Sequence, residues 1–96
     1  MAKSPDPGNY RLISGEFNPE EAREILMTLI EDKISFHERN NWSRREHRLD
    51  TDEGAKRIDQ LRKTKAQIAA LLEEAATAGD RLAINCNIEI SPAPKR

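Results

Sequence analysis

Apolar and polar residues alternate without interruption in the segment LAINCNIEI, from Leu82 to Ile90. Successive side chains of an extended chain point to opposite faces, so this segment has one apolar face and one face of small or polar residues. The apolar face carries Leu82, Ile84, Cys86, Ile88 and Ile90. This alternation predicts a half-buried strand over residues 82–90, whose apolar face must pack against another apolar surface.

A shorter strand is predicted near the N-terminus, over Tyr10–Ser14, where three apolar residues stand among polar ones. Gly15 is expected to break or bulge this strand. Residues 1–8 contain two prolines and a glycine, and we expect a disordered tail there. Residues 91–96 are polar and broken by prolines, and we expect a second flexible tail there.

Between the strands, apolar residues recur every three or four positions, first in a segment that begins at Asn18. Asn18 is expected to cap this helix, with Pro19 as its first residue and Glu21 placed to complete a capping box. We expect the helix to end near Arg39, because the two asparagines that follow can adopt left-handed dihedral angles. The apolar stripe contains Ala22, Ile25, Leu26, Leu29, Ile30 and Ile34, followed by Phe36 or His37.

A second helix is expected to follow the connection at residues 40–49. Asp50 is its predicted N-cap, Glu53 stands at the matching capping position, and Gly79 ends the helix. Its apolar positions are three and four residues apart in turn, which is a heptad seam. The seam contains Ile58, Leu61, Lys65, Ile68, Leu72 and Ala75. We expect Lys65 to extend its ammonium group to the edge of the seam; a role in fixing register is the alternative.

The order strand, helix, helix, strand predicts a small two-layer α+β fold. In this βααβ unit an antiparallel helical hairpin packs on a two-stranded antiparallel ribbon, and residues 9–90 form one domain. A lone two-stranded ribbon is weak in water, and its long last strand has an unprotected edge. We therefore expect a homodimer or a larger symmetric assembly, with the interface at Ile84, Cys86, Ile88 and Ile90.

Two arrangements of a second copy would satisfy this expectation. The last strands of two copies pair edge to edge in a four-stranded sheet, or the helices of the second copy complete the aliphatic face. A monomer whose strand edge is covered by one of the tails is the third possibility.

The connection between the helices is the best candidate for a partner-binding site. It combines the single tryptophan with arginines, both favoured at binding hot spots. The predicted partner-binding residues are Arg39, Trp42, Arg44, Arg45, His47 and Arg48. A solvated loop with local salt bridges and Trp42 packed on the hairpin end is the simpler interpretation. Nucleic-acid binding is the third, and it is disfavoured because the nine basic residues at positions 37–65 are interleaved with six acidic ones.

Composition and charge exclude several classes of function. The net charge of −1 gives no overall attraction to nucleic acid or to anionic lipid. Cys86 is the single cysteine, so an internal disulfide and a cysteine-based zinc site are excluded, and we expect Cys86 to act as a small buried hydrophobic residue. No apolar leader or membrane-spanning run is found, so we expect a cytoplasmic protein without membrane association.

No motif in the sequence points to catalysis. His37 and His47 are ten residues apart, which matches no compact metal-ligand spacing, and we expect His37 to cap the end of the first helix. The paired carboxylates of both first turns are explained by capping and the helix dipole. We expect no enzyme activity, no metal and no cofactor. The sequence favours an interaction or assembly module that homo-oligomerises and presents the connection to a protein partner; a weak nucleic-acid-associated accessory protein is the alternative.

Overall fold

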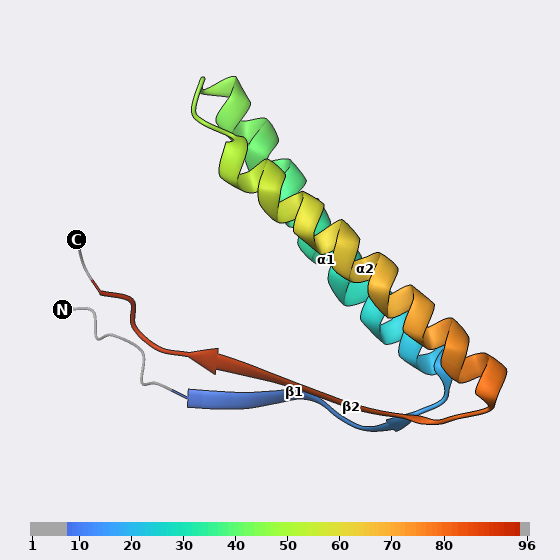
Figure 1. Cartoon of the computed structure of the whole chain (residues 1–96). Coiled ribbons are helices and arrows are strands. Elements are labelled where there is room, and N and C mark those ends of the chain that lie inside the picture. The colour runs from blue at the N-terminus through green and yellow to red at the C-terminus, as the bar shows by residue number, and fades with distance from the viewer. Residues whose placement is uncertain (1–7, 95–96) are drawn as a thin grey trace.

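The computed structural model describes residues 8–94, which form two strands and two long helices (Figure 1). In chain order they are β1 (Gly8–Phe17), α1 (Pro19–Glu46), α2 (Asp52–Ala78) and β2 (Leu82–Ile90). The helices are antiparallel and β1 pairs with β2 in a two-stranded antiparallel sheet. The predicted βααβ fold is confirmed, while its extension to four strands in a dimer stays a prediction. The tail was predicted over residues 1–8, but Gly8 belongs to β1. Residues 1–7, and residues 95–96 of the predicted C-terminal tail, lie outside the described residues.

Two of the predicted helix ends are confirmed. The Asn18 side chain accepts a hydrogen bond from the Glu21 N–H at 2.8 Å, and the Glu21 carboxylate accepts one from the Asn18 N–H at 3.2 Å. These reciprocal bonds form the capping box that starts α1. At the end of α2, Gly79 has a φ of 74°, the left-handed conformation that glycine adopts at low cost.

The end of α1 differs from the prediction, because the helix continues for seven residues beyond Arg39, to Glu46. Asn41 does not stop it: this residue is only 8 % exposed, and its side-chain amide donates to the Thr51 carbonyl at 3.3 Å. The Asn41 side chain fits against α2 because residue 54 is a glycine: a Cβ there would lie only 2.6 Å from Asn41 Cγ. Tertiary packing against α2 therefore prevails over the local tendency of asparagine to end a helix.

The start of α2 also differs from the prediction by one residue. Thr51, and not Asp50, occupies the N-cap position, and the helix begins at Asp52. Asp50 instead closes a short turn, in which its carboxylate accepts a hydrogen bond from the Asp52 N–H at 2.9 Å. The predicted capping pair of Asp50 and Glu53 is therefore wrong.

The helices pack along the predicted seam, but few side chains are fully buried. Among the described residues, the buried hydrophobic side chains are Ala22, Ile34, Leu72 and Ala75. Leu72, at 1 % exposed, is the large side chain with the most complete burial. Lys65 extends to the edge of the seam as expected, where its ammonium group lies 3.0 Å from the Glu31 carboxylate. Two of the four buried residues are alanines, so this core is small for the length of the helices.

Strand β1 is twice as long as predicted, and its bulge lies elsewhere. Gly15 neither breaks nor bulges the strand; it continues the pairing opposite Ile84. The register shifts instead between Arg11 and Ile13, with Tyr10 opposite Ile88 and Ile13 opposite Cys86. One extra residue in the strand changes which side chains share a face, so Tyr10 and Ile13 both lie on the apolar face of the ribbon.

The molecule has the shape of an open V, with the helical hairpin as one arm and the ribbon as the other (Figure 1). Its radius of gyration is 17.3 Å, whereas a compact chain of this length has about 12–13 Å. Its accessible surface is 8129 Å², compared with about 5,600 Å² for a compact monomer of this mass. The ribbon contacts the hairpin near the vertex of the V, through the first turns of α1, so most of the ribbon extends away from the helices.

Candidate interaction surfaces

The apolar face of the ribbon becomes more exposed with distance from the vertex. Ile84 and Cys86 are half-buried, whereas Ile88 and Ile90 are 40 % and 45 % exposed. Tyr10 of β1, which pairs with Ile88 of β2, is 56 % exposed. The four residues predicted as an oligomer interface therefore share one face, and its outer half is open. We call the exposed outer half, made of Tyr10, Ile88 and Ile90, the ribbon wall.

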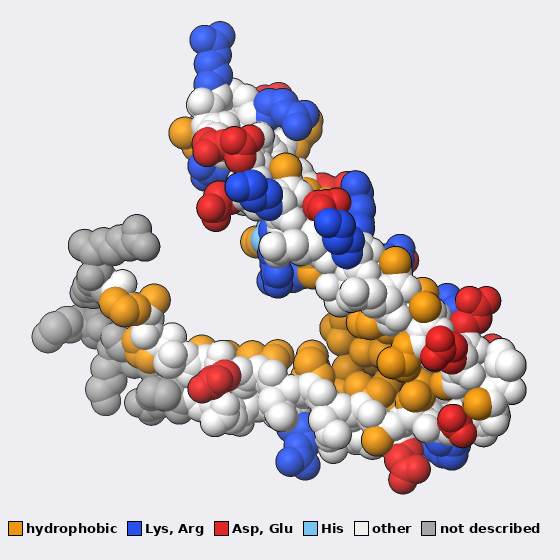
Figure 2. All heavy atoms as spheres, in the orientation of Figure 1, with side chains coloured by type: hydrophobic (Ala, Val, Ile, Leu, Met, Phe, Trp, Pro, Cys, Tyr) orange, Lys and Arg blue, Asp and Glu red, His pale blue; other side chains and the backbone are white. Residues whose placement is uncertain are grey.

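A second apolar surface runs along α1. Ile25, Leu29 and Phe36 are four and seven residues apart, which places them on one line of the helix. Ile25 is half-buried near the vertex, and the exposure rises to 38 % at Leu29 and 52 % at Phe36. We call these three residues the helix wall. Figure 2 shows hydrophobic side chains gathered in the angle between hairpin and ribbon and continuing along the ribbon side that faces the helices.

The sequence predicted these apolar positions but not their exposure. The apolar stripe of α1 covers more of the helix circumference than contact with one neighbouring helix requires. This width was the sign in the sequence that part of the stripe would stay exposed. Tyr10 was missed as a site residue because the bulge that turns it to the apolar face has no clear mark in the sequence.

At the other end of the hairpin, Trp42 lies on the surface. It is 63 % exposed, so the interpretation in which it packs on the hairpin end is wrong. Arg39 and Arg45 precede and follow it by three residues, on the same side of α1, and both are exposed. We call Arg39, Trp42 and Arg45 the Trp42 patch. Arg48 lies just beyond it, exposed and with a left-handed φ of 56°.

The remaining two predicted partner-binding residues hold the hairpin turn together. The Arg44 Nε–H donates to the Asp50 carbonyl at 2.6 Å, and Arg44 is partly buried. His47 ends α1, and its Nδ1 lies 2.9 Å from the Ser43 carbonyl. Of the six residues the sequence singled out, Arg44 is therefore least available to a partner, while His47 is exposed.

His37 does not cap the end of α1, because the helix continues nine residues beyond it. Its Nε2 is buried without a hydrogen-bond partner among the described residues. The ring of Phe36 stands edge-on to the His37 ring at 5.3 Å, and the Lys33 ammonium group lies 5.7 Å from the centre of the Phe36 ring. His37 therefore belongs to the packing between the helices, and the capping role falls to His47.

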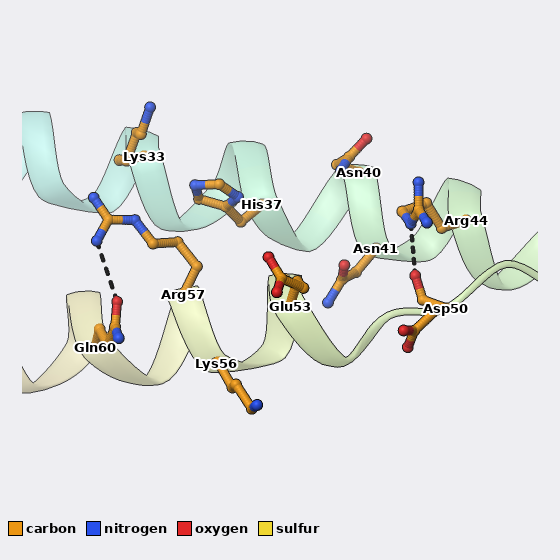
Figure 3. Close-up of a pocket in the computed structure, with 11 residues that line it drawn as sticks. Lys33, His37, Asn40, Asn41, Arg44, Asp50, Glu53, Lys56, Arg57 and Gln60 are labelled. Atoms are coloured by element: carbon orange, nitrogen blue, oxygen red, sulfur yellow. Dashed lines mark hydrogen bonds between the residues drawn. The ribbon is translucent and has the colours of Figure 1, made fainter. Parts of the chain in front are cut away.

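A shallow groove of about 600 Å³ lies between the helices in the half of the hairpin near the turn. Arg57 and Glu53 extend from α2 toward α1 across this groove, and Arg57 donates to Gln60 at 3.3 Å (Figure 3). Its lining mixes four basic with two acidic side chains, so it offers no single charge to a ligand. In residues 8–94 no group of three or more histidine, cysteine or acidic side chains is arranged to hold a metal ion.

Comparisons of the chain with protein-family models, with curated proteins and with solved structures found no match. In the described part of the chain, neither helix combines the length and apolar character that crossing a membrane requires. The assignment of a role therefore depends on the surfaces themselves.

Proposed function

We propose that the protein is a non-enzymatic interaction and assembly module. It self-associates through the apolar face of its ribbon and presents the Trp42 patch to a protein partner. The observation that carries the proposal is the combination of a small core with two exposed apolar walls in one open angle. Apolar surface of this extent, bordered by polar residues, marks an interaction site in soluble proteins.

Energetics support self-association. A domain of this size buries only a modest part of its surface, and small cores give little stability. This chain buries an even smaller part of its surface, because its ribbon covers the helices only near the vertex. Covering the walls with a second copy removes the exposed parts of Tyr10, Ile88 and Phe36 from water. Each is about half exposed, so each gains roughly half of the about 1.5–3 kcal/mol that complete burial of a large apolar side chain contributes.

Support for the second surface comes from the composition of the Trp42 patch. Tryptophan and arginine dominate binding hot spots, and an exposed tryptophan with arginines on both sides fits a protein partner. Glu38 and Glu46 stand four residues from Trp42 on either side, so a polyanion would meet repulsion there. This arrangement favours a protein over a nucleic acid. The proposal includes a cytoplasmic location, where a thiol that has no disulfide partner, such as Cys86, stays reduced.

Size-exclusion chromatography with light scattering tests self-association. We expect a mass of about twice 10.9 kDa that falls toward the monomer mass on dilution. A mass of 10.9 kDa at every concentration up to the millimolar range contradicts the proposal.

The fluorescence of Trp42, the single tryptophan, reports directly on the second surface. We expect no change on titration with single-stranded or double-stranded oligonucleotides at low salt, where electrostatic binding is strongest. A saturable change that weakens steeply with salt would favour the nucleic-acid alternative. In-cell crosslinking should then recover a protein partner with the wild type and lose it with Trp42→Ala, while Thr77→Ala, on the far end of α2, keeps it.

A further inference from the structure

The ribbon wall and the helix wall of one chain do not cover each other. They diverge from the vertex of the V, and the outermost residues of both, Ile90 and Phe36, are 45 % and 52 % exposed. Each wall therefore lacks an apolar surface to pack against. In the self-associated protein, a second copy can supply the missing surface.

The outer part of the apolar ribbon face and the exposed part of the helix wall match each other in length. From Cys86, the half-buried residue next to the ribbon wall, to Ile90 the apolar face of the ribbon extends over about 13 Å, at roughly 3.3 Å per strand residue. From Leu29 to Phe36, its two exposed residues, the helix wall extends over about 11 Å, at roughly 1.5 Å per helical residue. A strand face and a helix stripe of equal length are suitable partners for the two layers of an α+β fold.

Resting on the proposed function, we propose that two copies clasp each other. The ribbon wall of each copy packs on the helix wall of the other, about a two-fold axis. Both contacts are equivalent, so the interface is closed and no further copy is added. Each open angle is then filled by the ribbon of the partner, and the polar outer faces of both ribbons stay in water.

The exposed area agrees with the size of a stable dimer. The five exposed residues of the two walls have exposed fractions between 38 % and 56 %. At roughly 200 Å² for each large apolar residue, they offer about 450 Å² per copy, or about 900 Å² in the dimer. Because about 65 % of a homodimer interface is apolar, this corresponds to roughly 1,400 Å² in total, within the range of stable interfaces.

Neither the net charge nor the interhelical ion pairs oppose this arrangement. The net charge of the chain is −1, so two copies repel each other weakly. The interhelical ion pairs Lys65–Glu31 and Arg62–Glu38 lie on another side of the hairpin, since Glu31 is about 140° around α1 from Phe36. The clasp therefore buries neither pair.

Edge-to-edge pairing of β2 strands is the competing arrangement of a dimer. It would extend the sheet and leave Phe36 in solvent, whereas the clasp buries Phe36 against the ribbon of the partner. Substitution of Phe36 therefore distinguishes the two arrangements, and substitution of Ile88 alone does not.

The experiment uses charge substitutions on opposite walls, Ile88→Glu and Phe36→Lys, each in the full chain. The clasp predicts that each variant alone raises the dissociation constant of the dimer at least about 100-fold, because both symmetric contacts are changed. When the two variants are unfolded together and refolded as a mixture, a heterodimer should form. It has one contact with opposite charges and one contact that is entirely wild type.

Matched controls carry the same charges away from the walls. Asn87→Glu is on the outer face of the ribbon, and Thr28→Lys is exposed on α1 about 80° from Phe36. Both should dimerise as the wild type does. Refolding of the mixture also covers the case in which the single variants do not fold alone, because heterodimer formation restores the fold.

The outcomes separate the clasp from the proposed function. A dimeric Phe36→Lys variant, or a mixture that does not form the heterodimer, overturns the clasp while wild-type self-association stands. Loss of dimerisation in the Asn87→Glu control, with Phe36→Lys unaffected, assigns the interface to the strand edge and also overturns the clasp. A wild-type chain that stays monomeric overturns both.

A crosslink tests the clasp without charge changes. In a Cys86→Ala background, one chain carries Phe36→Cys and a second, longer tagged chain carries Ile88→Cys. The clasp predicts a mixed disulfide between the two chains in at least about half of the molecules, the statistical share of the heterodimer. Homodisulfides of the Ile88→Cys chain as the main product contradict it.

Discussion

Leu72 is the large side chain that the hairpin buries most completely, so its truncation should show how much of the fold depends on a single contact. Leu72 is 1 % exposed, whereas the adjacent Leu71 is 55 % exposed. The same substitution at these neighbours removes the same atoms from the same helix. The helix propensity and the composition of the chain change equally, and only the burial of the lost atoms differs.

Leu72→Ala should cost about 3 kcal/mol of folding free energy, since Leu→Ala in a core costs roughly 2–5 kcal/mol including the cavity. Leu71→Ala should cost less than about 1 kcal/mol, because over half of Leu71 is already in water. Domains of this length have a total stability of roughly 5–15 kcal/mol. The first change therefore removes a large part of the stability, and the second leaves most of it.

Urea unfolding followed by circular dichroism at 222 nm measures both values. All chains are compared at one protein concentration, because self-association makes apparent stability depend on concentration. Equal losses for the two variants, or a loss below about 1 kcal/mol for Leu72→Ala, would refute the assignment of the core to the contact between α1 and α2.

Three other substitutions and one double variant test single features of the fold. Gly54→Ala should destabilise the protein by about 1–2 kcal/mol in urea unfolding, although alanine favours helix, because its Cβ would collide with the Asn41 amide. Adding Asn41→Ala should then cost less than the sum of the two single changes, and strict additivity would argue against the collision. Asn18→Ala should lower stability by about 1 kcal/mol in the same assay through loss of the capping box, and no change would contradict the cap's contribution. Trp42→Ala should leave the free energy of unfolding unchanged within about 0.5 kcal/mol in the same assay, and a larger loss would mean that the indole packs on the hairpin.

Local sequence rules predicted the parts of the fold that depend on local physics. The capping box of α1, the left-handed Gly79 and the alternation of β2 each involve residues a few positions apart, and all three are confirmed. The heptad spacing of α2 likewise placed Leu72 and Ala75 on the apolar side of the helix, and both are buried.

The parts that the sequence did not predict depend on contacts between distant residues. Asn41 is a helix-ending residue by propensity, yet its burial against Gly54 keeps α1 intact. The register shift near Arg11 is visible only once β1 is paired with β2. The open V was unexpected for a similar reason, because apolar periodicity shows that a face needs cover and does not say which chain provides it.

The register shift in β1 also decides which changes in length the strand tolerates in evolution. The single additional residue resets the phase of the strand, so that Tyr10 faces the same way as Ile13 although three positions separate them. Deleting one of the two residues between them would remove the bulge and leave Tyr10 and Ile13 two positions apart, still on the same face of a regular strand. Among homologues, we therefore expect a one-residue gap between these two positions to leave the aromatic residue opposite the counterpart of Ile88, which keeps the inner surface intact.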